Sequence, residues 1–162
     1  RWCSRATMDA MAAKNSVDDV SKAIIEQLQQ DGRRAYATIG KAVGLSEAAV
    51  RQRVQRLIES GAMQIVAVTD PLELGFARQA MSGINVQGPI EPVADALSAM
   101  DEIAYVVITA GGFDILAEVI CESDEDLLNT LSTKVRSIPG VSTTETFVYL
   151  KLRKQTYAWG VR

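Results

Sequence analysis

The sequence contains no histidine, and its two cysteines, Cys3 and Cys121, lie far apart. Without histidine the chain has no Ser-His-Asp triad, no His-Glu-x-x-His metal motif and no Cys/His zinc site. Two distant cysteines do not provide the disulfide framework of a small secreted domain. Enzymes usually take their general base near neutral pH from histidine, so the composition favours a function other than catalysis.

The chain also lacks long apolar runs, and no window approaches the roughly 18 consecutive apolar residues of a transmembrane helix. Its 162 residues, 48% of them hydrophobic, are enough for one ordinary domain or two small ones. No apolar segment typical of a secretory signal follows Arg1 and Arg5, and residues 1–16 show no clear periodicity. We therefore expect a flexible arm over 1–16 and a cytoplasmic protein.

The formal net charge of −3 is distributed unevenly. Residues 1–67 carry ten Lys and Arg against seven Asp and Glu, whereas residues 68–162 carry seven against thirteen. A basic first part and an acidic second part predict two modules with different partners. The pI near 5 argues against a nucleic-acid binder only if the chain is taken as a whole.

Three helices are predicted in the first module, over residues 17–30, 36–43 and 47–60. Ser16 is the expected N-cap of the first helix, and Gly32 follows its end. Gly44 permits a sharp turn between the second and third helices, and Ser46 is a good N-cap for the third. This order predicts a helix-turn-helix domain over 17–61.

The third predicted helix has an apolar stripe and a polar face. The stripe consists of Val50, Val54, Leu57 and Ile58. The opposite face carries small, amide and guanidinium side chains, which suit base edges and phosphates of DNA. A merely solvated face is the alternative, but the short helix and glycine turn before it favour a recognition helix. One further candidate for DNA binding, Arg33, lies ahead of the second helix. The full set of candidate DNA-binding residues is Arg33, Ser46, Ala48, Arg51, Gln52, Arg53, Gln55 and Arg56.

Residues 62–77 are interpreted as a linker with a connecting strand, because a strand-like apolar run is broken at Thr69-Asp70-Pro71. A βαββαβ pattern then occupies residues 78–152, and a tail follows over 153–162. The expected strands are 78–87, 103–110, 113–121 and 141–152, and the expected helices start at Pro92 and span 123–137. In the second of these helices the side chains expected to point inward are Leu127, Leu128, Leu131 and Val135. The predicted fold class is α+β: a helix-turn-helix (winged-helix-like) domain followed by a ferredoxin-like domain.

The predicted sheet is apolar on both faces, although its helices are expected to cover only one. Along the strand 103–110, Tyr105 and Val107 alternate with Val106 and Ile108. A bare apolar sheet face is usually buried by a partner, so we expect a homodimer formed through the sheets. The alternative is that the first module folds back over this face.

Gly111-Gly112-Phe113-Asp114, between two predicted strands, is a candidate small-molecule site. Glycine N–H groups can hold a carboxylate and Asp114 can pair with an ammonium, the two charges of a free amino acid. We expect a side chain at Gly112 to obstruct a ligand, and the turn to favour a positive φ there. Taken alone, the same pattern fits a simple turn. The candidate effector-binding residues are Tyr105, Thr109, Gly111, Gly112 and Asp114.

An acidic run over 122–126 is interpreted as a helix start rather than a metal site. Ser123 and Asp126 have the spacing of a capping box, and negative charge is favourable at a helix N-terminus. We expect no metal in this protein.

These motifs resemble those of the Lrp/AsnC (leucine-responsive, or feast/famine) transcription regulators of bacteria and archaea. The resemblance runs from about residue 17 to residue 152. It rests on Asp31-Gly32-Arg33, Gly44-Leu45-Ser46, Val50, Arg53-Val54, Leu57, Gly61, Leu74-Gly75 and Gly111-Gly112-Phe113-Asp114, where the family typically has Gly-x-Tyr/Phe-Asp. One departure is Ile39-Gly40 in place of Leu-Ala, which we expect to loosen the helix pair slightly. Another is Ala62-Met63 in place of a more β-branched pair.

The resemblance implies a sequence-specific transcription regulator that binds pseudo-palindromic double-stranded DNA. It implies that residues 78–152 are an effector-binding and oligomerisation (RAM) domain that forms homodimers and often octamers. Family effectors are usually amino acids or related small molecules, bound near the glycine turn. Apart from such an effector we expect no cofactor, and we expect no membrane partner.

Two other function classes stay open from the residues. A metabolic enzyme such as an acylphosphatase-type hydrolase needs a phosphate loop with an arginine near the first strand, and Arg78 has no glycine-rich loop beside it. An assembly module that no longer binds DNA would have a recognition helix stripped of Arg and Gln, and this helix keeps both.

Overall fold

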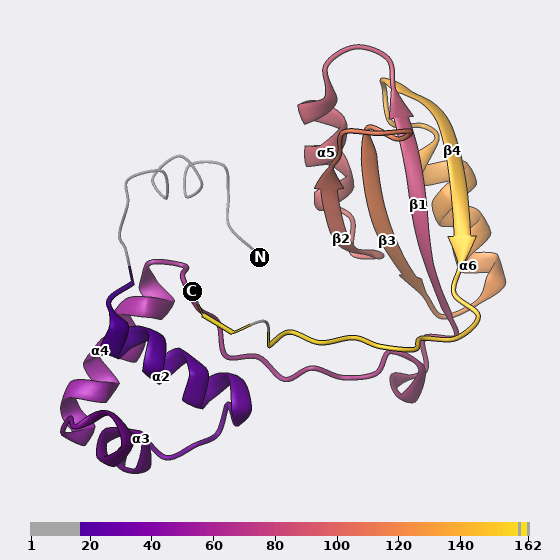
Figure 1. The fold of residues 1–162 in the computed structure, drawn as a ribbon. Helices are drawn as coiled ribbons and strands as arrows, with labels where there is room; N and C mark the ends of the chain where they lie inside the picture. The colour runs from indigo at the N-terminus through magenta and orange to yellow at the C-terminus, as the bar shows by residue number, and fades with distance from the viewer. Residues whose placement is uncertain (1–16, 159, 162) are drawn as a thin grey trace. The chain divides into compact units, whose positions relative to one another are not determined.

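The computed structural model describes residues 17–158, 160 and 161. The arm expected over 1–16 lies outside these described residues. The described chain divides into two compact units, each with its own apolar core (Figure 1). The first unit contains the residues up to Ala67 and those from Lys154 onward, and the second contains 68–153.

The first unit is built from α2 (Asp19–Gln30), α3 (Tyr36–Val43) and α4 (Glu47–Glu59). Asp18 caps α2, because its Oδ1 accepts a 2.8 Å hydrogen bond from the Ser21 N–H, so the cap expected at Ser16 is wrong. Gly44, between α3 and α4, has a φ of 72°, which glycine adopts without steric strain. The order of α3, turn and α4 confirms the predicted helix-turn-helix.

The three helices bury their apolar faces in one core. Ile24, Ile39 and Val50 are fully buried there, and Val54 is 2% exposed. Ile58, which the sequence pattern places in the same stripe, is 40% exposed. It lies about 100° beyond Leu57 around the helix, at the margin of the buried face. The stripe of α4 is therefore narrower than expected.

Gly40 lies in a close contact between α3 and the turn that follows it. Its carbonyl accepts a 2.9 Å hydrogen bond from the Leu45 N–H. A Cβ at position 40 would lie 2.5 Å from the Leu45 carbonyl oxygen, closer than real Cβ contacts occur. The glycine thus permits a close approach of the turn, in contrast to the looser helix pair that was expected at Ile39-Gly40.

Residues 62–77 contain no strand, so the expected connecting strand is wrong. A single turn of 3₁₀ helix, η1 (Leu72–Leu74), lies within this segment. Ile65, Val66 and Val68 are exposed. A strand needs hydrogen bonds from a neighbouring strand, and each strand pairing among the described residues is made inside the four-stranded sheet of the second unit.

The second unit has the predicted βαββαβ order. Its elements are β1 (Arg78–Val86), α5 (Ile90–Ser98), β2 (Ile103–Ile108), β3 (Ile115–Cys121), α6 (Asp124–Asn129), the π-helical η2 (Thr130–Val135) and β4 (Val141–Val148). The strands form one antiparallel sheet in the order β2-β3-β1-β4, as expected for a ferredoxin-like fold (Figure 1). The α+β fold class is confirmed.

Several boundaries differ from the sequence expectation. α5 begins two residues before Pro92, which is tolerated in a first turn because its missing N–H has no partner there. β4 ends at Val148 instead of 152: Val148 pairs with Ala80 of β1, and beyond it only the Tyr149 N–H continues the ladder, with a 2.8 Å hydrogen bond to the Gln79 carbonyl. Leu128, expected to point inward, is 65% exposed, whereas Thr130 in the π-helical turn is buried.

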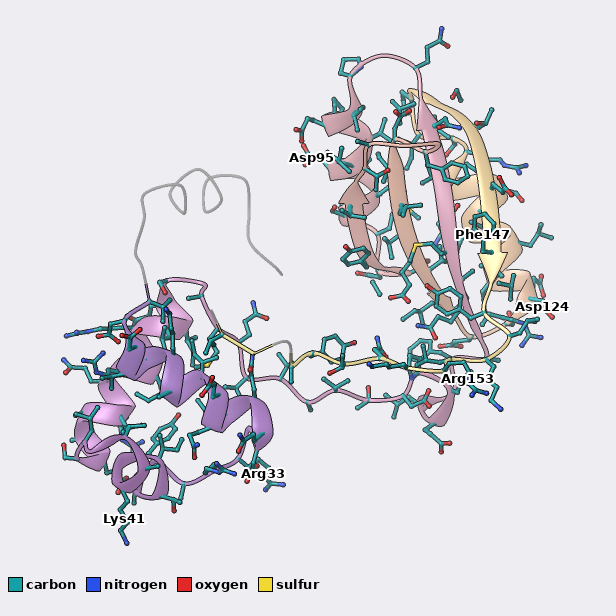
Figure 2. All side chains as sticks on the ribbon, viewed as in Figure 1. Arg33, Lys41, Asp95, Asp124, Phe147 and Arg153 are labelled. Atoms are coloured by element: carbon teal, nitrogen blue, oxygen red, sulfur yellow. The ribbon has the colours of Figure 1, made fainter. Side chains whose placement is uncertain are left out.

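The two helices of this unit cover one face of the sheet. Leu97 of α5 and Val135 of η2 pack there against Ala80, Ile84 and Val119 of the strands. On the other face, hereafter the open face, the exposed side chains include Tyr105 and Phe147, the latter labelled in Figure 2. The ring of Phe113 packs edge-on to Phe147, with ring centroids 6.4 Å apart.

Candidate nucleic-acid interface

Helix α4 is anchored on one side and exposed on the other. Ser46 caps it, with its Oγ accepting a 3.2 Å hydrogen bond from the Ala49 N–H. Val50 and Val54 fix its inner face in the core. Its exposed residues include five of the expected DNA-binding residues, Ala48, Arg51, Gln52, Gln55 and Arg56. The fixed inner face holds these side chains on a rigid element.

The outward side chains of α4 share one surface. The described residues that line an open hollow along the helix are Ala48, Ala49, Arg51, Gln52, Gln55, Arg56 and Glu59. Gln55 donates a 2.9 Å hydrogen bond to Glu59, whereas Arg56 has no side-chain partner among the described residues. The structure thus brings five expected DNA-binding residues together, with donors and acceptors on an exposed helix face.

Arg51 is positioned by two neighbours. Its Nη2 lies 2.8 Å from Oε1 of Glu47, and its Cζ lies 5.3 Å from the centroid of the Tyr36 ring. A cation held over an aromatic ring and beside a carboxylate has fewer rotamers to lose when it meets another partner. The sequence pattern alone did not indicate a role for Tyr36, although it shows an aromatic residue at the start of the second helix.

Arg53 lies apart from this surface. Its Nη1 is 2.6 Å from Oδ2 of Asp18 and 3.0 Å from Oγ of Ser21, so it joins α4 to the start of α2. The hydrogen bond from Arg53 is the main reason why the pKa of Asp18 falls from 3.8 to about 2. The structure therefore does not place Arg53 with the outward residues, because a carboxylate and a hydroxyl on α2 already engage it.

Arg33 lies on the loop between α2 and α3, where Figure 2 labels it. Its side chain is exposed, and its backbone N–H donates a 2.9 Å hydrogen bond to Asp31. The neighbouring Arg34 donates hydrogen bonds to Gln27 and Gln30 of α2. Of these two basic residues, Arg33 is the one whose guanidinium stays available to an external anion.

The glycine turn between β2 and β3 is open. Gly111 and Gly112 are exposed, and a Cβ at either position would meet nothing within 4 Å. Neither has a positive φ, so that expectation for Gly112 is wrong. Their N–H groups donate no hydrogen bond within the described part of the chain, which leaves two donors free at this turn.

One carboxylate oxygen of Asp114 is hydrogen-bonded to the backbone of β1. Its Oδ2 accepts a 2.8 Å hydrogen bond from the Val86 N–H, at the point where the register of β1 and β4 shifts. Its backbone N–H also donates to the Ile84 carbonyl at 3.0 Å. The other oxygen, Oδ1, has no partner among the described residues. This contact could not be predicted from the sequence pattern, because Val86 lies 28 positions away.

Thr109 and Tyr105, the other expected effector residues, differ in their relation to this turn. The Thr109 N–H donates to the Asp114 carbonyl at 2.8 Å, and its hydroxyl donates to the Phe113 carbonyl. Tyr105 lies on the open face, 52% exposed, and makes no hydrogen bond to the turn among the described residues. The structure therefore joins Thr109, but not Tyr105, to Asp114.

The acidic run occupies the start of α6, as expected. Ser123 accepts a 3.1 Å hydrogen bond from the Asp126 N–H, and Asp124 pairs with Arg78. In the part of the chain that the structure describes, no three His, Cys, Asp or Glu side chains are grouped to hold a metal ion.

Comparison with known proteins assigns both units. The sequence model of the AsnC-type helix-turn-helix domain matches residues 17–58. The sequence model of the C-terminal dimeric α+β barrel domain of AsnC-type regulators matches residues 76–162, more than half of the chain. The chain belongs to the Lrp/AsnC family of transcriptional regulators.

Individual Lrp/AsnC proteins are similar over most of their length. The chain is 35% identical over 142 residues to the transcriptional regulator FL11 of Pyrococcus horikoshii, covering 86% of this chain and 93% of that protein. For FL11 of Pyrococcus furiosus the identity is 38%, with the same coverage. AsnC of Escherichia coli superposes with a TM-score of 0.73 at 25% identity, over 86% of this chain and 95% of AsnC.

A second solved structure, a transcriptional regulator from Neisseria meningitidis in complex with L-Met, has a TM-score of 0.77. The superposition covers 88% of this chain and 96% of that one, and at 20% identity it shows a shared fold.

As an Lrp/AsnC member, the protein is a DNA-binding transcriptional regulator. Its relatives are regulators rather than enzymes, which removes the hydrolase alternative. The family domain that matches the second unit is dimeric. None of the helices in the described residues is both long enough and apolar enough to cross a membrane.

Proposed function

We propose that α4 reads operator DNA in the major groove through Gln52, Gln55 and Arg56. Glutamine pairs with adenine edges, arginine pairs with guanine edges, and the small Ala48 lets the helix approach the bases closely. Arg51 and Arg33 supply phosphate contacts that set the position of the helix. The observation that carries this proposal is the exposed face shared by these side chains, on a helix that Val50 and Val54 anchor in the core on its opposite side.

Single substitutions of these side chains test the assignment. An operator is first selected by gel shift from genomic fragments with competitor DNA. Arg56→Ala, Gln52→Ala and Gln55→Ala are then expected to weaken operator binding by about 1–3 kcal/mol each if they read bases. Asn129→Ala removes an exposed amide from α6 and is the control. Wild-type affinity in all three α4 variants would refute the assignment of this face.

We also propose that the protein forms homodimers through the open face of its sheet and that dimers assemble into octamers. Exposed aromatic side chains on this face support a sheet-to-sheet interface. Tyr105→Glu in the full chain is expected to reduce the mass measured by light scattering. Leu128→Glu adds the same charge to an exposed leucine on α6 and should leave the mass unchanged. If the Tyr105→Glu variant has the wild-type mass, the protein does not assemble through the open face.

We infer that the glycine turn binds the effector and that the effector is an amino acid. The free N–H groups of Gly111 and Gly112 suit a carboxylate, and the unoccupied Oδ1 of Asp114 suits an ammonium. The L-Met complex of a regulator with the same fold supports this ligand class. We assign no other cofactor and no metal to the protein, and we place it in the cytoplasm.

The effector site is tested by calorimetric titration with the twenty amino acids. Asp114→Asn keeps an oxygen for the Val86 N–H but removes the charge, so it is expected to abolish binding while the fold stays intact. Asp95→Asn makes the same change at an exposed position on α5 and is the control. Equal binding to wild type and Asp114→Asn would place the site elsewhere, and no binding by wild type would exclude an amino-acid effector.

A further inference from the structure

The segment that follows β4 carries a charge opposite to that of the unit it leaves. Residues 150–158, here called the basic segment, contain Lys151, Arg153 and Lys154 and no acidic residue. Residues 68–149 contain three Lys and Arg against thirteen Asp and Glu. The positive charge of the second part of the chain is thus concentrated in this segment.

The cations of the basic segment are free, whereas the three Lys and Arg side chains of residues 68–149 are engaged. Arg136 donates a 3.2 Å hydrogen bond to Thr144, and the other two form ion pairs. Arg78 pairs with Asp124 and Lys134 pairs with Glu102. By contrast, the three side chains of the basic segment form no ion pair and no hydrogen bond with the described residues, although the unit before them is rich in carboxylates. Every residue from 150 to 158 is exposed, and none belongs to a helix or strand (Figure 2 labels Arg153).

The position of the segment in the fold indicates its partner. The boundary between the two compact units runs through this segment: Lys154 belongs to the unit that contains the helix-turn-helix, and Lys151 and Arg153 are the last cations of the second unit. Unpaired cations on an extended, exposed backbone suit a polyanion with regularly spaced charges, and phosphates on duplex DNA have this character. Since the segment offers no rigid element to reach base edges, such contacts would carry no sequence information.

We propose that the basic segment is a second DNA-binding element of this regulator, which contacts backbone phosphates and supplies affinity without specificity. The proposal rests on the function of the first unit as a DNA-binding domain. The competing occupant is a second copy of the chain, because Leu150 is 97% exposed and Leu152 is 55% exposed on the same segment. The unengaged charges favour DNA, since a contact through the leucines leaves them without a role.

The test uses the full chain with Lys151→Gln, Arg153→Gln and Lys154→Gln combined. Binding to a labelled duplex of arbitrary sequence is followed by fluorescence anisotropy over a series of salt concentrations. Removal of one cation from a phosphate should lower the slope of log affinity against log salt by about 1. We expect the triple variant to bind more weakly, with a slope lower by about 2 to 3 per protomer, and with an unchanged ratio of operator to non-operator affinity.

Two matched variants separate local from general charge effects. Lys151→Arg, Arg153→Lys and Lys154→Arg together keep the charges and should retain the wild-type slope. Asn129→Asp, Ser132→Asp and Thr133→Glu change the net charge by the same amount at exposed positions in the second unit and should also leave the slope unchanged.

Three results would overturn the proposal. They are a wild-type slope in the triple glutamine variant, an equal reduction of slope in the acidic control, and a changed mass by light scattering without a changed slope. The last would assign the segment to self-association. If the triple glutamine variant has the wild-type slope while Arg56→Ala weakens operator binding, the basic segment does not contact DNA. The assignment of the DNA-binding face of α4 would then still hold.

Discussion

Replacing Gly40 with alanine tests the packing of the helix-turn-helix directly. In most helix interiors this exchange stabilises a protein by roughly 0.5–1 kcal/mol, because glycine loses more backbone entropy on folding. At Gly40 the new Cβ would lie 2.5 Å from the Leu45 carbonyl oxygen and 3.5 Å from the Leu45 and Ser46 carbonyl carbons. All three atoms belong to backbone, which cannot move aside as a flexible side chain does.

The expected net effect is a loss of stability. Overpacking of this kind typically costs about 1–3 kcal/mol, which exceeds the gain in helix propensity. We therefore expect Gly40→Ala to destabilise the first unit by about 1–2 kcal/mol. That corresponds to roughly 4–16 °C in the melting temperature of a small domain. The displaced turn also shifts Ser46 and α4, so DNA affinity should fall as well.

Thermal and urea unfolding of the full chain, followed by far-ultraviolet circular dichroism, measures the effect. Gly32→Ala is the matched control, because a Cβ there has ordinary contacts, 3.8 Å to Leu28 and 3.9 Å to Ile65. The control should be as stable as wild type or slightly more stable. If Gly40→Ala behaves like the control, the close approach of turn and helix is incorrect.

Three further predictions concern other contacts. The pKa of Asp18 is about 2 in the folded protein and 3.8 as its ordinary value, so the Arg53 pair stabilises fully above about pH 4. This stability should disappear as the pH falls toward 2, and an acid titration of Asp18→Asn should lack that component. Gly83→Ala places a Cβ 2.6 Å from the Phe113 ring and should destabilise the second unit by about 1–3 kcal/mol, as measured by urea unfolding. An unchanged midpoint of the urea transition would contradict this. Burial raises the pKa of the Cys121 thiol, so peptide mapping after alkylation at pH 8 should find it protected in the native protein, and rapid labelling would contradict the burial.

Features set by neighbouring residues could be predicted from the sequence. The turn before α4 needs a glycine at Gly44 and a capping hydroxyl at Ser46, and both signals lie within three positions. The outward face of α4 follows from helical periodicity once Val50 and Val54 are placed inside. The βαββαβ order follows from the alternation of strand and helix periods along the chain.

Features set by distant residues could not be predicted. From the sequence, Arg53 is indistinguishable from the other basic residues of α4. Its hydrogen bond to Asp18, 35 positions away, is apparent only in the structure. The apolar run after α4 reads as a strand, but strand formation depends on a pairing partner that the local sequence does not reveal. Leu128 reads as a core residue because a regular helix was assumed, whereas a π-helical turn follows it.

Asp114 has a structural contact that does not depend on the proposed effector. One oxygen closes the irregular end of β1 through the Val86 N–H, and that need exists whether or not any ligand is present. Replacing this aspartate would lower the stability of the fold even in a protein that binds no small molecule, since the Val86 N–H would be left without its acceptor. An aspartate at this turn is therefore a poor diagnostic of sensing in related proteins. The glycines before it, whose added Cβ would contact none of the described residues, are the better indicator.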